Sequence, residues 1–207
     1  ALVLAPTREL AVQIESEAGR FGASAGARHT CVYGGVPKPP QQRELRRGVE
    51  LCIATPGRML DFVDSRVVAL GRVTYLCLDE ADRMLDMGFE PQVRRICAKT
   101  RAERQTLLWT ATWPPEVSAI ASTFLTNPLR VTVGSLEVTA NHAIEQQVRV
   151  VCEADKYAEL IKLLESELSD GKMLVFLATK RACDVVVRQL RGDGWPALAI
   201  HGDKTQQ

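Results

Sequence analysis

Three carboxylates follow an apolar run within four residues of each other. The run 75–78 reads Y-L-C-L, and Asp79, Glu80 and Asp82 come directly after it. Carboxylates this close repel one another, and such a cluster is stable when it holds a cation such as a phosphate-bound Mg²⁺. In that chemistry Asp79 holds the metal mainly through water, and Glu80 orients or deprotonates an attacking water. The alternative is structural, because acidic residues also favour the positive end of a helix dipole.

The elements that must position these carboxylates alternate along the chain between short apolar runs and helical patterns. Residues 8–21 form one such pattern, with an apolar face made of Leu10, Ile14, Ala18 and Phe21. Loops rich in Gly, Pro, Thr or acidic residues follow the expected strands at 1–5, 30–33, 51–54, 75–78, 106–109 and 130–133. This rhythm predicts an α/β fold with a parallel sheet, in which ligands bind at the carboxyl ends of the strands.

The rhythm lapses once, between residues 134 and 146, where the chain is polar and lacks helical periodicity. We therefore expect a linker at 135–146 between a first domain at 1–134 and a second at 147–207. In the second domain the pattern predicts strands at 147–151, 173–177 and 197–200 and helices at 157–168 and 181–191. Both domains are expected to be truncated, because the chain starts inside an apolar strand and stops before a second sheet has room to form.

Composition indicates a folded protein but identifies no partner. Lys and Arg number 26 against 25 Asp and Glu, and hydrophobic residues make up 46% of the chain. Residues 1–130 hold 17 basic and 14 acidic side chains, so neither half is strongly charged. No basic tail or stripe stands out along the sequence, and nucleic-acid binding cannot be inferred from charge alone.

The six cysteines have no C-x-x-C spacing, and several lie in apolar runs. This usage favours buried free thiols in a reducing compartment over metal binding or disulfides. No apolar stretch approaches the roughly 20 residues that a membrane-spanning helix needs. We therefore expect a protein of the nucleus, the cytoplasm or both, with no membrane contact.

The segment D-E-A-D at 79–82, followed by R-M-L-D-M-G-F at 83–89, resembles the Walker B motif of DEAD-box RNA helicases. Five further motifs of that family occur in the family's order, namely P-T-R-E-L-A at 6–11, G-G at 34–35, T-P-G-R at 55–58, T-A-T at 110–112 and H-G-D at 201–203. The resemblance covers essentially the whole chain. It implies two RecA-like domains with ATP between them and single-stranded RNA running across both.

The resemblance also implies a function, an ATP-dependent RNA helicase that couples ATP hydrolysis with Mg²⁺ to local duplex unwinding or RNP remodelling. The implied catalytic residues are Asp79, Glu80, Asp82, Thr110 and Thr112. The implied RNA-binding residues are Pro6, Thr7, Arg8, Gly34, Gly35, Thr55, Arg58, Thr179 and Lys180. Contacts of this kind reach the RNA backbone, so little base specificity is expected. Protein partners in RNP complexes are expected as well.

Several of these residues also have ordinary structural interpretations. Arg8 could pair locally with Glu9, and Gly34-Gly35 could be a plain turn. Thr112 could cap the helix that follows it, a role compatible with a hydrogen bond to the acidic segment. The strand ending at Thr179-Lys180 could simply be buried.

The phosphate-binding pattern G-x-x-x-x-G-K-[S/T] occurs nowhere in the chain. In the family this loop and the adenine-recognising glutamine motif precede the position of Ala1, and the arginine finger follows that of Gln207. The chain alone is therefore expected to be inactive. Two rival functions stay open: a non-catalytic RNA-binding scaffold, which an intact Glu80 argues against, and a DNA translocase.

Overall fold

A computed structural model describes residues 1–134, 143–168 and 171–204. The chain divides into two compact units, Ala1–Thr139 and Ala140–Gln207. This division falls within the expected linker at 135–146, of which residues 135–142 lie outside the described part of the chain. None of the described helices has the length and apolar character needed to cross a membrane.

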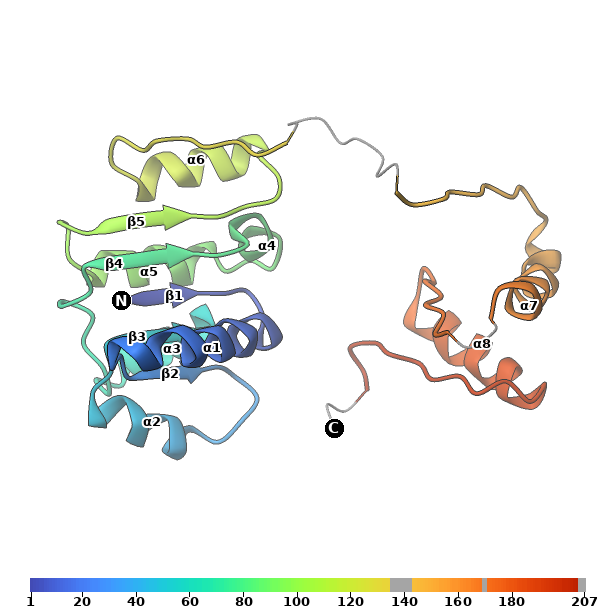
Figure 1. The fold of residues 1–207 in the computed structure, drawn as a ribbon, viewed down its shortest axis with the longest axis horizontal. Coiled ribbons are helices and arrows are strands. Elements are labelled where there is room, and N and C mark those ends of the chain that lie inside the picture. The colour runs from blue at the N-terminus through green and yellow to red at the C-terminus, as the bar shows by residue number, and fades with distance from the viewer. Residues whose placement is uncertain (135–142, 169–170, 205–207) are drawn as a thin grey trace. The chain divides into compact units, whose positions relative to one another are not determined.

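The first unit is built on a sheet of five parallel strands (Figure 1). In the order in which they lie side by side, the strands are β2 (His29–Val32), β3 (Leu51–Ala54), β1 (Leu2–Leu4), β4 (Tyr75–Leu78) and β5 (Gln105–Leu108). The predicted α/β fold with a parallel sheet is confirmed. The expected strands at 51–54 and 75–78 form at those same residues, because each is a short apolar run bounded by strong turn residues.

Helices follow the strands and cover both faces of the sheet (Figure 1). They are α1 (Arg8–Gly22), α2 (Lys38–Arg47), α3 (Pro56–Asp64), α4 (Ala81–Asp86), α5 (Glu90–Lys99) and α6 (Pro115–Phe124), with a 3₁₀ turn η1 at Ala23–Ala25. Successive side chains of a strand point to opposite faces. Leu2 and Leu4 therefore enter the larger core with Phe62 of α3, whereas Ile53 packs on the α1 side.

Helix α1 begins where the sequence predicts, because Thr7 is its N-cap and the Thr7 hydroxyl accepts a hydrogen bond from the amide of Leu10 at 3.3 Å. Ile14 and Ala18 pack against the smaller core, as their spacing indicates. Phe21 was expected on the same face, and this expectation is wrong. Phe21 is 70% exposed, and the Arg20 guanidinium lies 5.5 Å from the centre of its ring.

The second unit contains a 3₁₀ turn η2 (Glu153–Asp155) and the helices α7 (Lys156–Glu167) and α8 (Lys180–Gly192). Both helices lie within about a residue of their predicted positions. The strands expected at 147–151, 173–177 and 197–200 do not form in the described residues, nor does the one at 130–133. A strand needs a neighbour for its backbone N–H and C=O groups. These segments pair with none in the described chain, and side chains such as Phe176 are left 90% exposed.

Candidate functional site

The parallel sheet brings the predicted site residues of the first unit to one edge. Because all five strands point the same way, their carboxyl ends lie together (Figure 1). The three neighbouring strands β2, β3 and β1 lead into the residues predicted to bind RNA, which are Gly34, Gly35, Thr55, Arg58, Pro6, Thr7 and Arg8. The adjacent strands β4 and β5 lead into the predicted catalytic residues, Asp79, Glu80, Asp82, Thr110 and Thr112.

A pair of hydrogen bonds joins the segments that follow β4 and β5. Thr112 donates to Oδ2 of Asp82 from its backbone amide at 3.1 Å and from its hydroxyl at 2.8 Å. The Thr110 hydroxyl donates to the Thr112 carbonyl at 2.8 Å and so braces this turn. The T-A-T and D-E-A-D segments are thus linked by hydrogen bonds. Helix α6 is capped at Pro114, so the interpretation of Thr112 as its N-cap is wrong.

The Asp82 carboxyl responds to this environment in two opposing ways. Burial raises its pKa, since a charge is costly away from water. Hydrogen bonds from the Thr112 side chain and from the amides of Arg83 and Thr112, together with the nearby Thr110 hydroxyl, lower it and outweigh the burial. The pKa of Asp82 therefore lies below its ordinary value, and the carboxylate stays ionised while bound to Thr112.

Thr112→Val is expected to raise the pKa of Asp82 toward its ordinary value of about 3.9, because it removes the strongest of the lowering hydrogen bonds. The sign for stability follows from linkage. A carboxyl whose pKa is lower in the folded state than in the unfolded state stabilises the protein at any pH above its unfolded-state pKa. This stabilisation is lost as the pH falls through the folded-state pKa. NMR titration of the Asp82 carboxyl checks the shift. Thr123→Val, whose hydroxyl bonds only Ala119 within α6, is the matched control and should leave the titration unchanged.

Glu80 occupies a strained turn between β4 and α4. Its backbone is left-handed, with φ 49° and ψ 54°, a conformation that non-glycine residues rarely adopt. Neighbouring contacts hold the turn: Asp79 Oδ1 accepts from the Glu80 amide at 3.0 Å, and the Ala81 amide donates to the Trp109 carbonyl at 3.0 Å. Backbone strain of this kind gathers at functional sites, where the surrounding structure maintains it.

Glu80→Asn is expected to stabilise the fold by roughly 0.5–1 kcal/mol, because asparagine tolerates the left-handed region better than glutamate. Thermal unfolding of the two chains measures this. The same substitution at Glu15, which lies in the middle of α1, should destabilise instead, since asparagine is a poorer helix former. A lower melting temperature for Glu80→Asn would show that the Glu80 turn carries no strain.

The three carboxylates do not form a shared cation cage. No group of three possible metal-ligating side chains occurs among the described residues. Asp82 bonds Thr112. The prediction that the acidic segment holds a cation, with Asp79 as the ligand, stays a prediction. Asp79 is half-buried at the end of β4, and one carboxylate completed by water and phosphate oxygens suits Mg²⁺. Asp79 therefore fits its predicted role through water.

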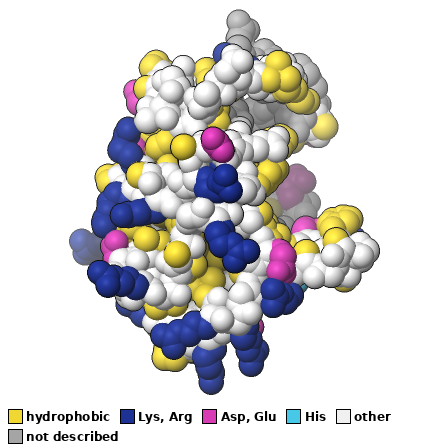
Figure 2. Space-filling model, turned by 90° about the vertical axis from the view of Figure 1, so that its left-hand side faces the viewer, with side chains coloured by type: hydrophobic (Ala, Val, Ile, Leu, Met, Phe, Trp, Pro, Cys, Tyr) yellow, Lys and Arg dark blue, Asp and Glu magenta, His cyan; other side chains and the backbone are white. Residues whose placement is uncertain are grey.

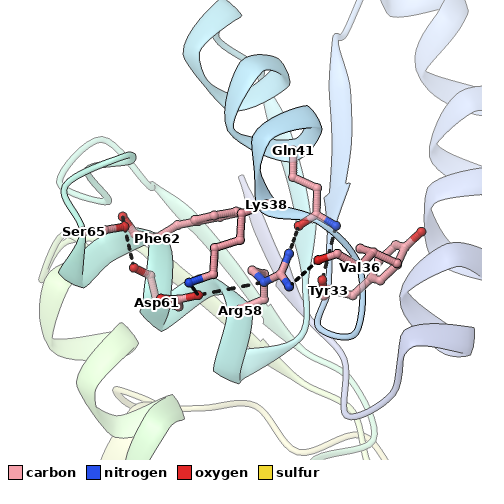
Figure 3. A network of polar contacts seen from close by, with 8 residues as sticks. All are labelled: Tyr33, Val36, Lys38, Gln41, Arg58, Asp61, Phe62 and Ser65. Atoms are coloured by element: carbon pink, nitrogen blue, oxygen red, sulfur yellow. Dashed lines mark hydrogen bonds and ion pairs between the residues drawn. The ribbon is translucent and has the colours of Figure 1, made fainter.

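Arg58 is a buried cation, with only 8% of its side chain exposed. Its Nη1 donates to Oε1 of Gln41 at 2.8 Å, and its Nη2 donates to the Val36 carbonyl at 2.9 Å. Nε2 of Gln41 donates in turn to the Tyr33 carbonyl at 3.2 Å. As Figure 3 shows, the guanidinium bonds Gln41 and the Val36 carbonyl and so holds the loop that contains Gly34-Gly35. This geometry favours a positioning role.

The same loop is anchored at its far end. Nζ of Lys38, at the start of α2, lies 2.7 Å from Oδ2 of Asp61 in α3 (Figure 3). The contributions of Gln41, Lys38 and Asp61 to the site were not predicted from the sequence. Only the dense prolines around Lys38 marked the segment as unusual, and partners 17 to 23 residues apart leave no local pattern to recognise.

Gly35 requires glycine for its backbone, with φ +78°. A Cβ added at Gly34 or Gly35 would meet no atom within 4 Å. No described part of the chain therefore packs closely against these two glycines. The space over this loop is open to a ligand.

The remaining predicted RNA ligands have structural roles of their own. Arg8 lies over the Tyr33 ring, 4.9 Å from its centre. The buried Thr55 donates its amide to the Val32 carbonyl at 3.0 Å. In the second unit Thr179 caps α8, accepting from the Ala182 amide at 3.1 Å. Lys180 pairs with Asp203 at 2.7 Å. Their contacts with RNA stay predictions.

The fold and the site together define an α/β protein with a RecA-like domain. A crystal structure of a hypothetical ATP-dependent RNA helicase from Sulfolobus tokodaii superimposes with a TM-score of 0.58 at 37% sequence identity, covering 61% of this chain and 38% of that one. The model of the DEAD/DEAH box helicase family matches residues 1–120. The chain belongs to the DEAD/DEAH box helicase family.

Curated relatives agree with this assignment. The chain is 58% identical over 205 residues to DEAD-box ATP-dependent RNA helicase 20 of Oryza sativa subsp. japonica, covering 99% of this chain and 42% of that protein. It is 61% identical over 207 residues to ATP-dependent RNA helicase DBP2 of Lodderomyces elongisporus, covering 99% and 38%. The chain thus spans about two fifths of the length of these relatives.

Proposed function

We propose that this chain is the part of an ATP-dependent RNA helicase that joins the water-activating acids to the RNA-binding loops. The observation that supports the proposal is the bond between Asp82 and Thr112, which ties the segment after β4 to the segment after β5. Its relatives are named as RNA helicases, and its family is that of DEAD/DEAH box helicases.

In this proposal each group at the carboxyl edge has one task. Glu80 orients or deprotonates the attacking water, and its strained turn holds the carboxylate in place. Asp79 would hold Mg²⁺ through water, and the metal supplies charge neutralisation on the phosphates. The Asp82–Thr112 bond passes a change at the acids to the turn after β5, which is the coupling that a helicase needs.

The proposed substrate is the backbone of single-stranded RNA, with Arg8, Thr7 and the open loop at Gly34-Gly35 as contacts. Hydroxyl, guanidinium and glycine backbone groups recognise phosphate and ribose without reading bases. Protein partners in RNP complexes and a place in the nucleus, the cytoplasm or both belong to the same proposal. The six cysteines, all free, support a reducing compartment.

ATP hydrolysis by the full-length protein tests this proposal. Single-stranded RNA is expected to stimulate turnover, and DNA of the same base sequence to do so weakly, because DNA lacks the 2′-hydroxyls. Equal stimulation by DNA would assign the protein to the DNA translocases. RNA binding without any hydrolysis would assign it to the non-catalytic scaffolds.

A further inference from the structure

The edge of the sheet opposite the candidate site is strongly basic. The amino ends of the parallel strands share this edge, and the segments that enter them are residues 26–28, 46–50, 64–74 and 99–104. These segments hold eight of the 17 basic side chains in residues 1–130 but only three of the 14 acidic ones. Figure 2 shows Lys and Arg spread over this face with few Asp or Glu between them.

Part of this charge is neutralised internally. Arg28 pairs with Glu50 at 2.7 Å, and hydrogen bonds from Arg28 hold the pKa of Glu50 at about 2, so this pair stays ionised. Arg101 lies 3.5 Å from Glu103. Four exposed cations of this edge have no ion-pair or hydrogen-bond partner for their side chains among the described residues, and these are Arg46, Arg66, Arg72 and Lys99. Unpaired like charges on one edge repel each other and favour a polyanionic ligand.

The distribution of these cations fits a phosphate backbone. Five strands about 4.8 Å apart spread the charges over roughly 19 Å. That length corresponds to about five phosphates of one nucleic-acid strand at ~3.4 Å of axial rise. Three of the four unpaired cations are arginines, whose planar guanidinium matches phosphate oxygens.

A protein partner fits this edge less well. The apolar residues Val67, Val68 and Val73 of the entering segments are partly buried against the main core. Among the described residues of those segments and the strand starts, only Tyr75, 36% exposed, counts as an exposed large hydrophobic side chain. Protein interfaces usually have an apolar centre. The edge offers no aromatic platform on which several bases could stack, so duplex RNA, which presents phosphates outward, is the better fit.

We propose that the amino edge, defined by Arg46, Arg66, Arg72 and Lys99, binds the phosphate backbone of duplex RNA, separately from the single-strand site at the carboxyl edge. This inference rests on the proposed RNA function. The surface would anchor the protein to a structured RNA while the opposite edge acts on a single strand. Recognition would depend on charge and shape and not on base sequence.

The test compares two variants of the 207-residue chain by fluorescence anisotropy, with a 20-base-pair RNA duplex and a short oligouridylate as probes. In the amino-edge variant Arg46, Arg72 and Lys99 are replaced by Gln, and in the control Arg94, Lys162 and Arg188 are replaced by Gln, which removes equal charge. The amino-edge variant is expected to bind the duplex about tenfold more weakly, with a salt slope lower by about 2 to 3. Oligouridylate binding should match that of the unaltered chain.

Each outcome has a distinct meaning. Equal loss of duplex affinity in both triple variants would reduce the effect to net charge and overturn the inference, as would unchanged affinity in the amino-edge variant. Capture of a polyglutamate peptide without duplex binding would assign the edge to an acidic protein segment and also overturn it. Failure of the unaltered chain to bind either RNA would instead count against the proposed function. Because the substituted side chains are exposed, thermal unfolding should be unchanged.

Discussion

Glu80→Gln is expected to lower RNA-stimulated ATP turnover of the full-length protein by roughly 10²- to 10⁴-fold, the usual contribution of a general base. The amide keeps the size of the side chain but cannot accept a proton from water. ATP and RNA binding should persist, because Asp79 and the RNA-binding loops are untouched. Steady-state hydrolysis with saturating RNA measures the loss, and equilibrium binding of RNA measures what is retained.

Glu17→Gln is the matched control, since Glu17 is an exposed side chain of α1 paired only with Arg20. It should hydrolyse ATP at the unaltered rate. Full turnover in Glu80→Gln would remove Glu80 from the catalytic step. If neither the unaltered protein nor the variant hydrolyses ATP although both bind RNA, the result would favour the function of a non-catalytic RNA-binding scaffold.

Arg58→Ala is expected to destabilise the first unit by roughly 2–5 kcal/mol, because it strands the buried polar groups of Gln41 and the Val36 carbonyl. Chemical denaturation with a probe in this unit measures the change. The stability of Arg58→Lys should lie between that of the unaltered chain and that of Arg58→Ala, because one ammonium group cannot replace a guanidinium that bonds two acceptors. Arg43→Ala, an exposed change on α2, should cost less than about 0.5 kcal/mol.

The salt dependence of RNA binding separates the two roles that Arg58 could have. A direct phosphate ligand adds about one unit to the slope of log affinity against log salt. A positioning residue lowers affinity without changing that slope. We therefore expect Arg58→Lys and the uncharged change Gln41→Ala to weaken single-strand binding in parallel, each with the slope of the unaltered protein. Loss of binding in Arg58→Ala alone, with a lower slope, would make Arg58 a ligand.

Local patterns predicted the first unit well and the second unit poorly. In the first unit an apolar run such as 75–78 has neighbours on the sheet, so its intrinsic preference and its surroundings agree. Residues 173–177 carry a similar pattern but pair with no strand in the described chain. Helices α7 and α8 formed as expected, because a helix satisfies its backbone within its own turns.

The order of motifs along the sequence identified the family and named the residues of the carboxyl edge. Spacing could not show what each side chain bonds. Arg58 looked like a free cation beside a strand, yet it is buried against Gln41, 17 positions earlier. Asp82 lies in an acidic cluster that suggests a cation site, and the structure shows that it accepts hydrogen bonds from Thr112, 30 positions later.

The sequence by itself determined the parallel α/β class, most strand ends of the first unit and the membership of the family, because short-range periodicity and motif letters encode these. The tertiary structure alone decided where charge gathers. Residues 1–130 are nearly neutral, and their arginines are scattered between acids along the chain. Parallel strands place the segments between helices on two opposite edges of the sheet, so arginines up to about 75 positions apart share one surface, and the acids predicted to be catalytic lie on the other.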